Sequence, residues 1–145
     1  MKRDEVLRSL NELYAEEVEA ALRYLHLAVT LTPQDREAHR AELLEGVQET
    51  LEHAQVIADK VLELGSVPRL RVRMELPGEA HSGREALLQA REFEGAARDA
   101  YRDLAEQAAD DAALRAFAEA QVELETRHLE RFEELIGEDE TAEGT

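Results

Sequence analysis

The chain has 145 residues, enough for one domain with a substantial core, and it contains no cysteine, which excludes disulfides, zinc–thiolate sites and thiol catalysis. Its 34 acidic residues outnumber 17 basic ones, and the net charge of −17 repels phosphate backbones and anionic lipids, so we expect neither a nucleic acid nor a membrane partner. There is no apolar run of membrane-spanning length and no signal-peptide core, so we expect a cytoplasmic protein.

The scarcity of proline and glycine, with abundant Ala, Glu, Leu and Arg, indicates an all-helical protein. A first helix is predicted from about residue 4 to 31. Thr32 can cap the next helix and Pro33 suits its first position. That second helix is predicted to run to residue 64, with Gly65 as the stop signal.

A third helix is predicted to open at the capping box that begins at Ser82, and to end near residue 108. An aspartate at position 110 or 111 caps the fourth helix, which we expect to end at Gly137. The sequence therefore predicts one bundle domain over residues 1–137. The acidic, small residues of 138–145 are predicted to be a disordered tail.

The connections between these helices predict how the bundle is threaded. The first and last pairs are joined by a few residues each, so each pair forms an antiparallel hairpin, whereas residues 65–81 separate the two hairpins. A helix of about 28 residues is roughly 42 Å long, and 17 extended residues reach about 56 Å. The crossover can therefore travel the whole bundle and set the second and third helices parallel, which is ferritin-like topology.

A glutamate and a histidine recur at the same interval in the two hairpins. Glu17 precedes His53 by 36 residues, and Glu92 precedes His128 by 36 residues. Glu125 adds a Glu-x-x-His turn ahead of His128. These side chains are expected at similar levels within the apolar stripes, where burial of carboxylates and imidazoles costs several kcal/mol unless a charge compensates it. The five residues together predict a metal site.

Other polar residues near the stripes have two interpretations each. Tyr24, seven residues after Glu17, is either a hydrogen-bonded core tyrosine or a redox-active donor beside the metal. Its counterpart 75 residues later is Asp99, which either orients a ligand histidine or forms a buried salt bridge. The remaining histidines are expected on the solvated surface: His26, His39 and His81.

Segments of all four helices resemble bacterioferritin: Leu10-Asn11-Glu12-Leu13, Glu52-His53-Ala54, Glu92-Phe93-Glu94-Gly95-Ala96 and Glu125-x-x-His128. The resemblance covers about residues 4 to 136. It implies a non-haem di-iron centre that oxidises Fe²⁺ with O₂ or H₂O₂. By the resemblance, Glu17 and His53 serve one metal, Glu92 and His128 the other, and Glu125 bridges. Tyr24 matches a family tyrosine near the site.

Three departures from the family pattern affect what is expected. Thr50 stands where a second bridging glutamate would be, so three carboxylates balance only three of the four charges of two Fe²⁺ ions. Glu49 adjoins this gap but is expected to point about 100° away around the helix. Leu51 takes the place of the haem-binding methionine, so no haem is expected. The short fifth helix of storage cages has no counterpart, so we expect a homodimer.

Carboxylates and imidazoles suit iron, with manganese as a second choice. The leading interpretation is a ferroxidase-type oxidoreductase that holds two iron ions and contributes to iron handling. Thr50 leaves two alternatives open. One is a metal-binding or regulatory bundle with a single metal and no redox turnover, and the other is a structural scaffold that dimerises.

Overall fold

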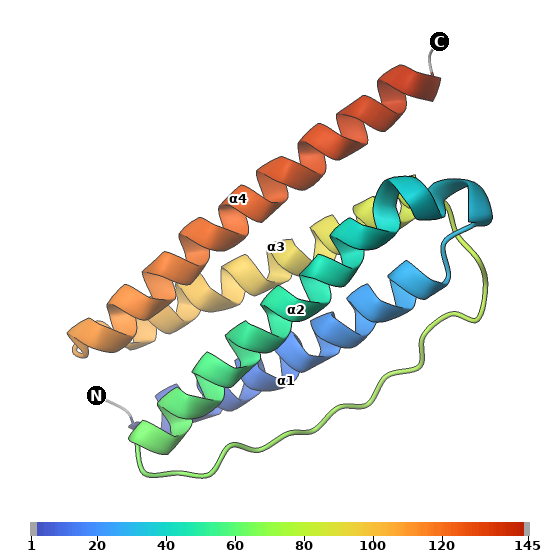
Figure 1. The fold of residues 1–145 in the computed structure, drawn as a ribbon. Helices are drawn as coiled ribbons and strands as arrows, with labels where there is room; N and C mark the ends of the chain where they lie inside the picture. The colour runs from blue at the N-terminus through green and yellow to red at the C-terminus, as the bar shows by residue number, and fades with distance from the viewer. Residues whose placement is uncertain (1–2, 144–145) are drawn as a thin grey trace.

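The computed structural model describes residues 3–143, and four helices hold most of them. These are α1 (Arg3–Val29), α2 (Pro33–Glu63), α3 (Gly83–Gln107) and α4 (Ala112–Glu143). Helices α1 and α2 form one antiparallel hairpin and α3 and α4 a second (Figure 1). Helices α2 and α3 run in the same direction, which confirms the predicted four-helix bundle with a long crossover. None of the described helices combines the length and the apolar character that a membrane span needs.

The two ends of α2 show which local signals were interpreted correctly. Pro33 occupies the start of the helix, as predicted. Thr32 makes no capping hydrogen bond with its side chain, and its hydroxyl donates to Asp35 Oδ2 at 3.3 Å. Gly65 follows the helix with a φ of +81°, a left-handed conformation that glycine adopts without a steric penalty.

The second hairpin begins as the sequence predicts but ends later. Ser82 Oγ accepts a hydrogen bond from Glu85 N at 3.1 Å, and Asp111 Oδ1 accepts one from Leu114 N at 3.0 Å, so both helices are capped. The prediction that α4 ends at Gly137 is wrong, because the helix continues through this glycine to Glu143. The last two residues of the predicted tail lie outside the described residues.

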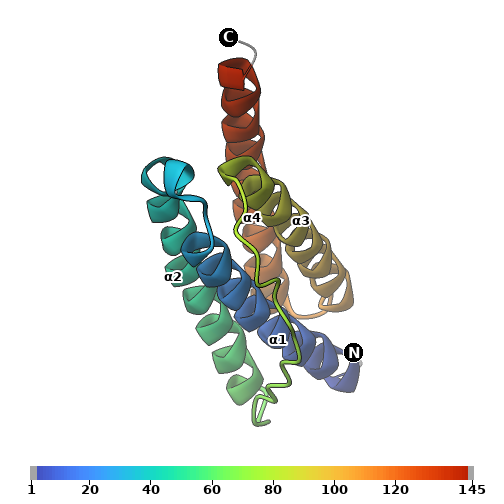
Figure 2. The same ribbon diagram turned by 90° about the vertical axis from the view of Figure 1, so that its right-hand side faces the viewer.

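The crossover between α2 and α3 follows α1 along the length of the bundle (Figures 1 and 2). Near its start, Arg69 N donates a hydrogen bond to Asn11 Oδ1 at 2.7 Å. Near its end, His81 N donates to Thr30 O at 3.0 Å, and Thr32 N donates to His81 O at 2.9 Å. The crossover is therefore attached to α1 at one end and to the α1–α2 turn at the other.

Two of the three histidines predicted to lie on the surface are buried. His81 is 9 % exposed because the crossover folds back on the α1–α2 turn. His39 is also 9 % exposed because its ring packs over Gly83, where a Cβ would come within 2.1 Å of the ring. These positions depend on contacts between distant segments, which helical periodicity does not describe.

The apolar core is divided into two parts along the bundle. One part, near the α3–α4 turn, includes Val6, Leu10, Leu13, Ile57, Val61, Tyr101, Leu104 and Leu114. The other, near the α1–α2 turn, includes Tyr24, Leu27, Leu31, Leu43, Leu87, Phe132 and Ile136. In sequence, Glu17 falls between the α1 members of the two parts, and Glu94 between their α3 members. A polar layer therefore interrupts the core midway along the helices.

The backbones of α2 and α4 stay apart. Helix α1 packs closely against α2, and α3 against α4, but in residues 3–143 no Cα of α2 comes within 8 Å of a Cα of α4. Side chains cross this gap instead, for example in the ion pair of Glu42 with Arg131 at 3.4 Å. Between α2 and α4, the polar layer is therefore closed by long side chains and not by closely packed helices.

Candidate metal centre

Three carboxylates are buried in the polar layer, on three different helices. Glu17 on α1, Glu94 on α3 and Glu125 on α4 are 3 %, 5 % and 1 % exposed. Among the described residues, the basic side chains that form ion pairs with them are His53 and His128. Three carboxylates buried with only two imidazoles are costly unless a further positive charge joins them.

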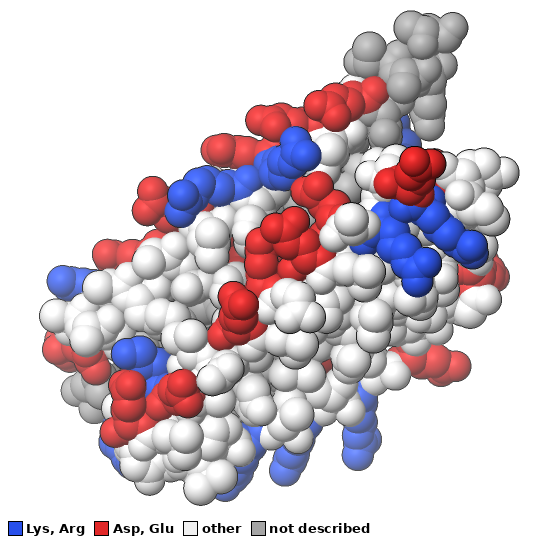
Figure 3. Space-filling view, viewed as in Figure 1, with Lys and Arg blue, Asp and Glu red and all other residues white. Residues whose placement is uncertain are grey.

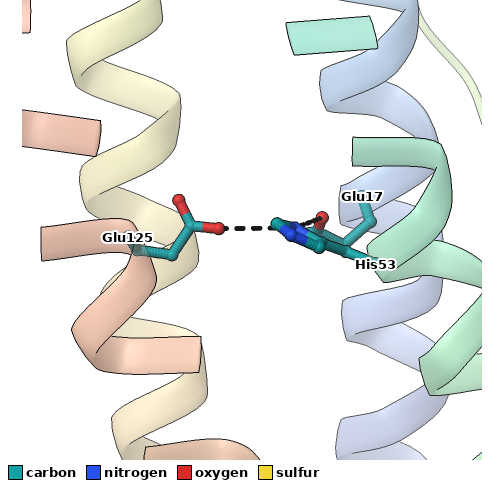
Figure 4. A group of neighbouring side chains, drawn as sticks. All are labelled: Glu17, His53 and Glu125. Atoms are coloured by element: carbon teal, nitrogen blue, oxygen red, sulfur yellow. Dashed lines mark ion pairs between the residues drawn. The ribbon is translucent and has the colours of Figure 1, made fainter. Parts of the chain in front are cut away.

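The first cluster of donors joins α1, α2 and α4. His53 Nδ1 lies 3.3 Å from Glu17 Oε2 and 3.6 Å from Glu125 Oε1. Figure 4 shows the imidazole between the two carboxylates. One donor atom from each residue lies within 4.8 Å of the other two, a spacing that can hold a metal ion.

The second cluster joins α3 and α4. His128 Nδ1 lies 3.7 Å from Glu94 Oε2 and 3.6 Å from Glu125 Oε2. Its donor atoms also lie within 4.8 Å of one another. Glu125 therefore belongs to both clusters, with Oε1 toward His53 and Oε2 toward His128.

The donor atoms fit a divalent cation. His53 Nδ1 and Glu125 Oε2 are buried and have no hydrogen-bond partner. Buried polar atoms normally have one, so these two lack a partner that a cation would supply. Oxygen and imidazole donors suit iron and manganese, and the absence of thiolates excludes a soft-metal site of the cysteine type.

The electrostatics of the metal-free site follow from burial and from the crowded carboxylates. Burial raises the pKa of Glu17 above its ordinary value, although His53 beside it lowers the pKa in part. The Glu94 carboxylate raises the pKa of His128, and this outweighs the opposite effect of burial. Without a cation the site therefore holds protons more tightly than the same groups in water.

Two tyrosines flank the clusters in a crossed arrangement. The Tyr24 hydroxyl on α1 donates a hydrogen bond to Glu94 on α3. Tyr101 on α3 is buried near Glu17 on α1, and burial, followed by the charge of Glu17, raises its pKa well above the usual value. Tyr101 was missed in the sequence, where Asp99 was taken as the counterpart of Tyr24. Asp99 is exposed and pairs with neighbouring arginines.

Glu92, the predicted ligand from the third helix, lies outside the centre. It is exposed and lines a shallow groove on the outer face of α3 and α4, while Glu94 lies about 200° further around the helix. The prediction assumed equal Glu-to-His intervals in both hairpins, but the interval from Glu94 to His128 is 34 residues. The interval of seven from Glu94 to Tyr101, the same as from Glu17 to Tyr24, points to the buried Glu94 instead.

Thr50, at the position of the expected second bridging glutamate, and Glu49 before it differ in burial and in what they contact. Thr50 is 4 % exposed and lies one helical turn before His53. Glu49 was expected to point away from the site, yet its Oε2 lies 3.2 Å from His128 Nε2. Its side chain is long enough to bend from a partly exposed position across the gap between α2 and α4.

Comparisons with known proteins agree with the fold of the bundle. A ferritin-like diiron-carboxylate protein from Bacillus anthracis str. Ames is 28 % identical, with 92 % of this chain and 96 % of that chain covered and a TM-score of 0.82. A dodecameric, bacterioferritin-related thioferritin from Bacteroides fragilis is 22 % identical, with coverage of 99 % and 91 % and a TM-score of 0.88. A bacterioferritin from Rhodobacter capsulatus is 21 % identical, with coverage of 92 % and 84 % and a TM-score of 0.83.

A search of curated protein sequences found no match. The family model of the ferritin-like domain matches residues 7–142, a range that includes nearly all of the four helices and every buried carboxylate and histidine of the centre. This match confirms the family that the helix motifs indicate, and the chain belongs to the ferritin-like domain family.

Proposed function

We propose that this protein holds two iron ions and oxidises Fe²⁺ with O₂ or H₂O₂, as a ferroxidase-type member of its family. One observation carries the proposal: Glu125 faces His53 with one oxygen and His128 with the other, so two donor clusters share one carboxylate. A shared carboxylate between two imidazole-containing clusters is the arrangement expected of a two-metal site.

The roles of the ligands follow from the two clusters. Glu17 and His53 would hold one ion, Glu94 and His128 would hold the other, and Glu125 would be shared between them. Iron supplies the redox chemistry of such a centre, and manganese suits the same donors. Tyr24 orients Glu94 through its hydrogen bond and is placed to donate an electron beside the second position.

The route to the centre that we favour lies between α2 and α4. A pocket of about 190 Å³ is lined there by Tyr24 and His128, by Glu42, Glu45 and Glu49 on α2, and by Arg131 on α4. Acidic side chains gather between these two helices on the surface (Figure 3). Such a surface attracts cations, so Fe²⁺ is expected to enter here.

The alternative is a single-metal centre without turnover. It is favoured by Thr50, because this buried residue supplies no carboxylate where a second bridge would complete the charge balance. Elemental analysis of protein purified with iron separates the candidates. Two ions per chain support the di-iron enzyme, one ion supports the single-metal centre, and none supports a structural scaffold. The absorbance of the ferric product after addition of Fe²⁺ and O₂ or H₂O₂ tests turnover directly.

We also propose that the chain forms a homodimer. The support is a set of large apolar side chains that are exposed on α1 and α2: Leu22, Leu25, Val29, Leu44 and Leu51. Light scattering tests this. A mass about twice the 16.3 kDa of one chain supports the dimer, whereas a mass near twelve chains would replace it with the dodecamer named for the Bacteroides fragilis protein.

A further inference from the structure

Both nitrogen atoms of the His128 ring face carboxylates. Nδ1 faces inward to Glu94 and Glu125, at 3.7 and 3.6 Å. Nε2 faces outward to Glu49 Oε2 on α2, at 3.2 Å. A proton on Nε2, shared with Glu49, leaves the Nδ1 lone pair free toward the inner cluster.

His53 lacks such an outer partner. Its Nδ1 faces Glu17 and Glu125, and within residues 3–143 no carboxylate forms an ion pair with its Nε2. The two imidazoles are therefore supported differently, although their inner surroundings are similar. The carboxylate that makes the difference lies next to Thr50, the residue that supplies no charge to the centre.

We propose that Glu49 is a positioning residue for His128. It accepts a hydrogen bond from the Nε2–H group, holds the ring with Nδ1 toward Glu94 and Glu125, and supplies the negative charge that Thr50 does not. This proposal rests on the proposed function, because it concerns a metal ion at the second donor cluster. With Glu49 the carboxylates near the two positions number four, which balances the charge of two divalent ions.

The solvent exposure of Glu49 and His128 determines whether their interaction affects metal affinity or folding stability. The Glu49 side chain is 41 % exposed and that of His128 is 23 % exposed, so water screens their attraction and the pair adds little to folding stability. A carboxylate behind a metal-bound histidine acts on metal affinity, because it fixes the tautomer and raises the basicity of the ligand. The effect of Glu49 is therefore expected in metal binding and not in the free energy of unfolding.

The test is a titration with Co²⁺ alone, followed by absorbance, on the wild type and on Glu49→Gln. Glutamine keeps the size and loses the charge, and the matched control is Glu52→Gln, an exposed glutamate three residues along α2. We expect the wild type to bind two ions and Glu49→Gln to bind one of them 10- to 100-fold more weakly. Glu52→Gln should leave both affinities within about twofold of the wild type.

Two further measurements separate positioning from a general structural effect. In protein loaded with diamagnetic Zn²⁺, the proton on His128 Nε2 should exchange with water more slowly in the wild type than in Glu49→Ala, because Glu49 accepts a hydrogen bond from it. Adding Thr50→Glu to Glu49→Gln should recover part of the lost affinity, because it returns a carboxylate to the centre.

The outcomes distinguish this proposal from the proposed function. Wild type that binds no Co²⁺ overturns both. Wild type that binds two ions, with Glu49→Gln indistinguishable from Glu52→Gln, overturns only the role of Glu49. If the wild type binds one ion, an unchanged affinity for it in Glu49→Gln overturns the role of Glu49, and a 10- to 100-fold loss supports it.

Discussion

Tyr24 donates a hydrogen bond to Glu94 across the bundle, from α1 to α3, and this links one hairpin to a proposed ligand of the other. Tyr101 occupies the corresponding place on α3 near Glu17, but among residues 3–143 no atom forms a well-aligned hydrogen bond with its hydroxyl. The two tyrosines are thus similarly buried, but their hydroxyl groups are expected to contribute differently to the free energy of unfolding.

Replacing each tyrosine by phenylalanine should therefore have different effects on the metal-free protein. Tyr24→Phe leaves a buried Glu94 oxygen without its donor, and we expect it to lower the free energy of unfolding by about 1–3 kcal/mol. Tyr101→Phe removes a buried hydroxyl that has only a poorly aligned contact with Glu17, so it should cost less stability than Tyr24→Phe. Urea denaturation of both variants measures this. Equal losses would show that the hydroxyl groups contribute equally.

Thr50→Glu should return the missing carboxylate to the centre. Thr50 is buried one turn before His53, so a glutamate there is expected to supply a fourth negative charge and two more oxygen donors. The weaker metal position should tighten, and oxidation of Fe²⁺ should become faster or more complete. Titration with Fe²⁺, followed by absorbance of the ferric product, measures both effects. An unchanged stoichiometry and rate would mean that position 50 does not face the metals.

His128→Ala and His53→Ala should each damage one metal position and spare the other, because each imidazole belongs to only one donor cluster. The loss should exceed the 10- to 100-fold that is typical when only the outer partner of a ligand is removed. Stepwise titration with Co²⁺ gives the two affinities separately. Simultaneous loss of both ions in either variant would indicate a cooperative centre in place of two separable positions.

Gly46 is required by the Tyr24 ring. A Cβ at this position would lie 2.8 Å from two carbon atoms of the ring, closer than a real contact allows. Gly46→Ala should therefore displace the ring and cost about 1–3 kcal/mol. Gly95→Ala is the matched control, because that glycine is also helical and nothing lies within 4 Å of an added Cβ. The control should gain about 0.5–1 kcal/mol from helix propensity.

The stability of the metal-free protein should fall as pH rises. The folded-state pKa of Glu17 is raised above 4.5 and that of His128 above 6.5, so the folded chain binds these protons more tightly than the unfolded chain. Each contribution is complete below the unfolded pKa and is lost as pH rises through the folded pKa. Urea denaturation from about pH 5 to about pH 8 should show wild type losing stability relative to Glu17→Gln and His128→Gln. Metal binding should instead tighten with pH, because the ligands must release protons.

The fold was predictable because its signals are local. The Ser82 cap and the Gly65 stop act within one turn of the chain, and a long crossover has few alternatives to parallel α2 and α3. Gly137 was misinterpreted because it was taken, as a local signal alone, for the end of the helix. A glycine inside a helix costs only about 1 kcal/mol, and without a proline beyond it the helix can continue.

The candidate site was predictable within a helix and less so between helices. Glu125 and His128 lie on adjacent turns of α4, so their proximity does not depend on the length of a loop between helices. Glu92 was chosen in place of Glu94 because an interval measured across a turn changes with the length of that turn. Glu49 was not expected at the site because only the direction of its Cβ around the helix was considered. A partly exposed glutamate side chain is long enough to reach a neighbouring helix.

The separation of α2 from α4 makes metal supply and thermal stability linked quantities. Because no Cα of α2 lies within 8 Å of a Cα of α4 in residues 3–143, an ion at the proposed site, held by His53 of α2 and Glu125 of α4, would act as a reversible crosslink between the hairpins. An ion that binds only the folded chain raises its stability by about 2.7 kcal/mol at a free concentration of 100 Kd, and by about 1.4 kcal/mol for each further tenfold increase. The melting temperature of this bundle should therefore report the free metal concentration around it.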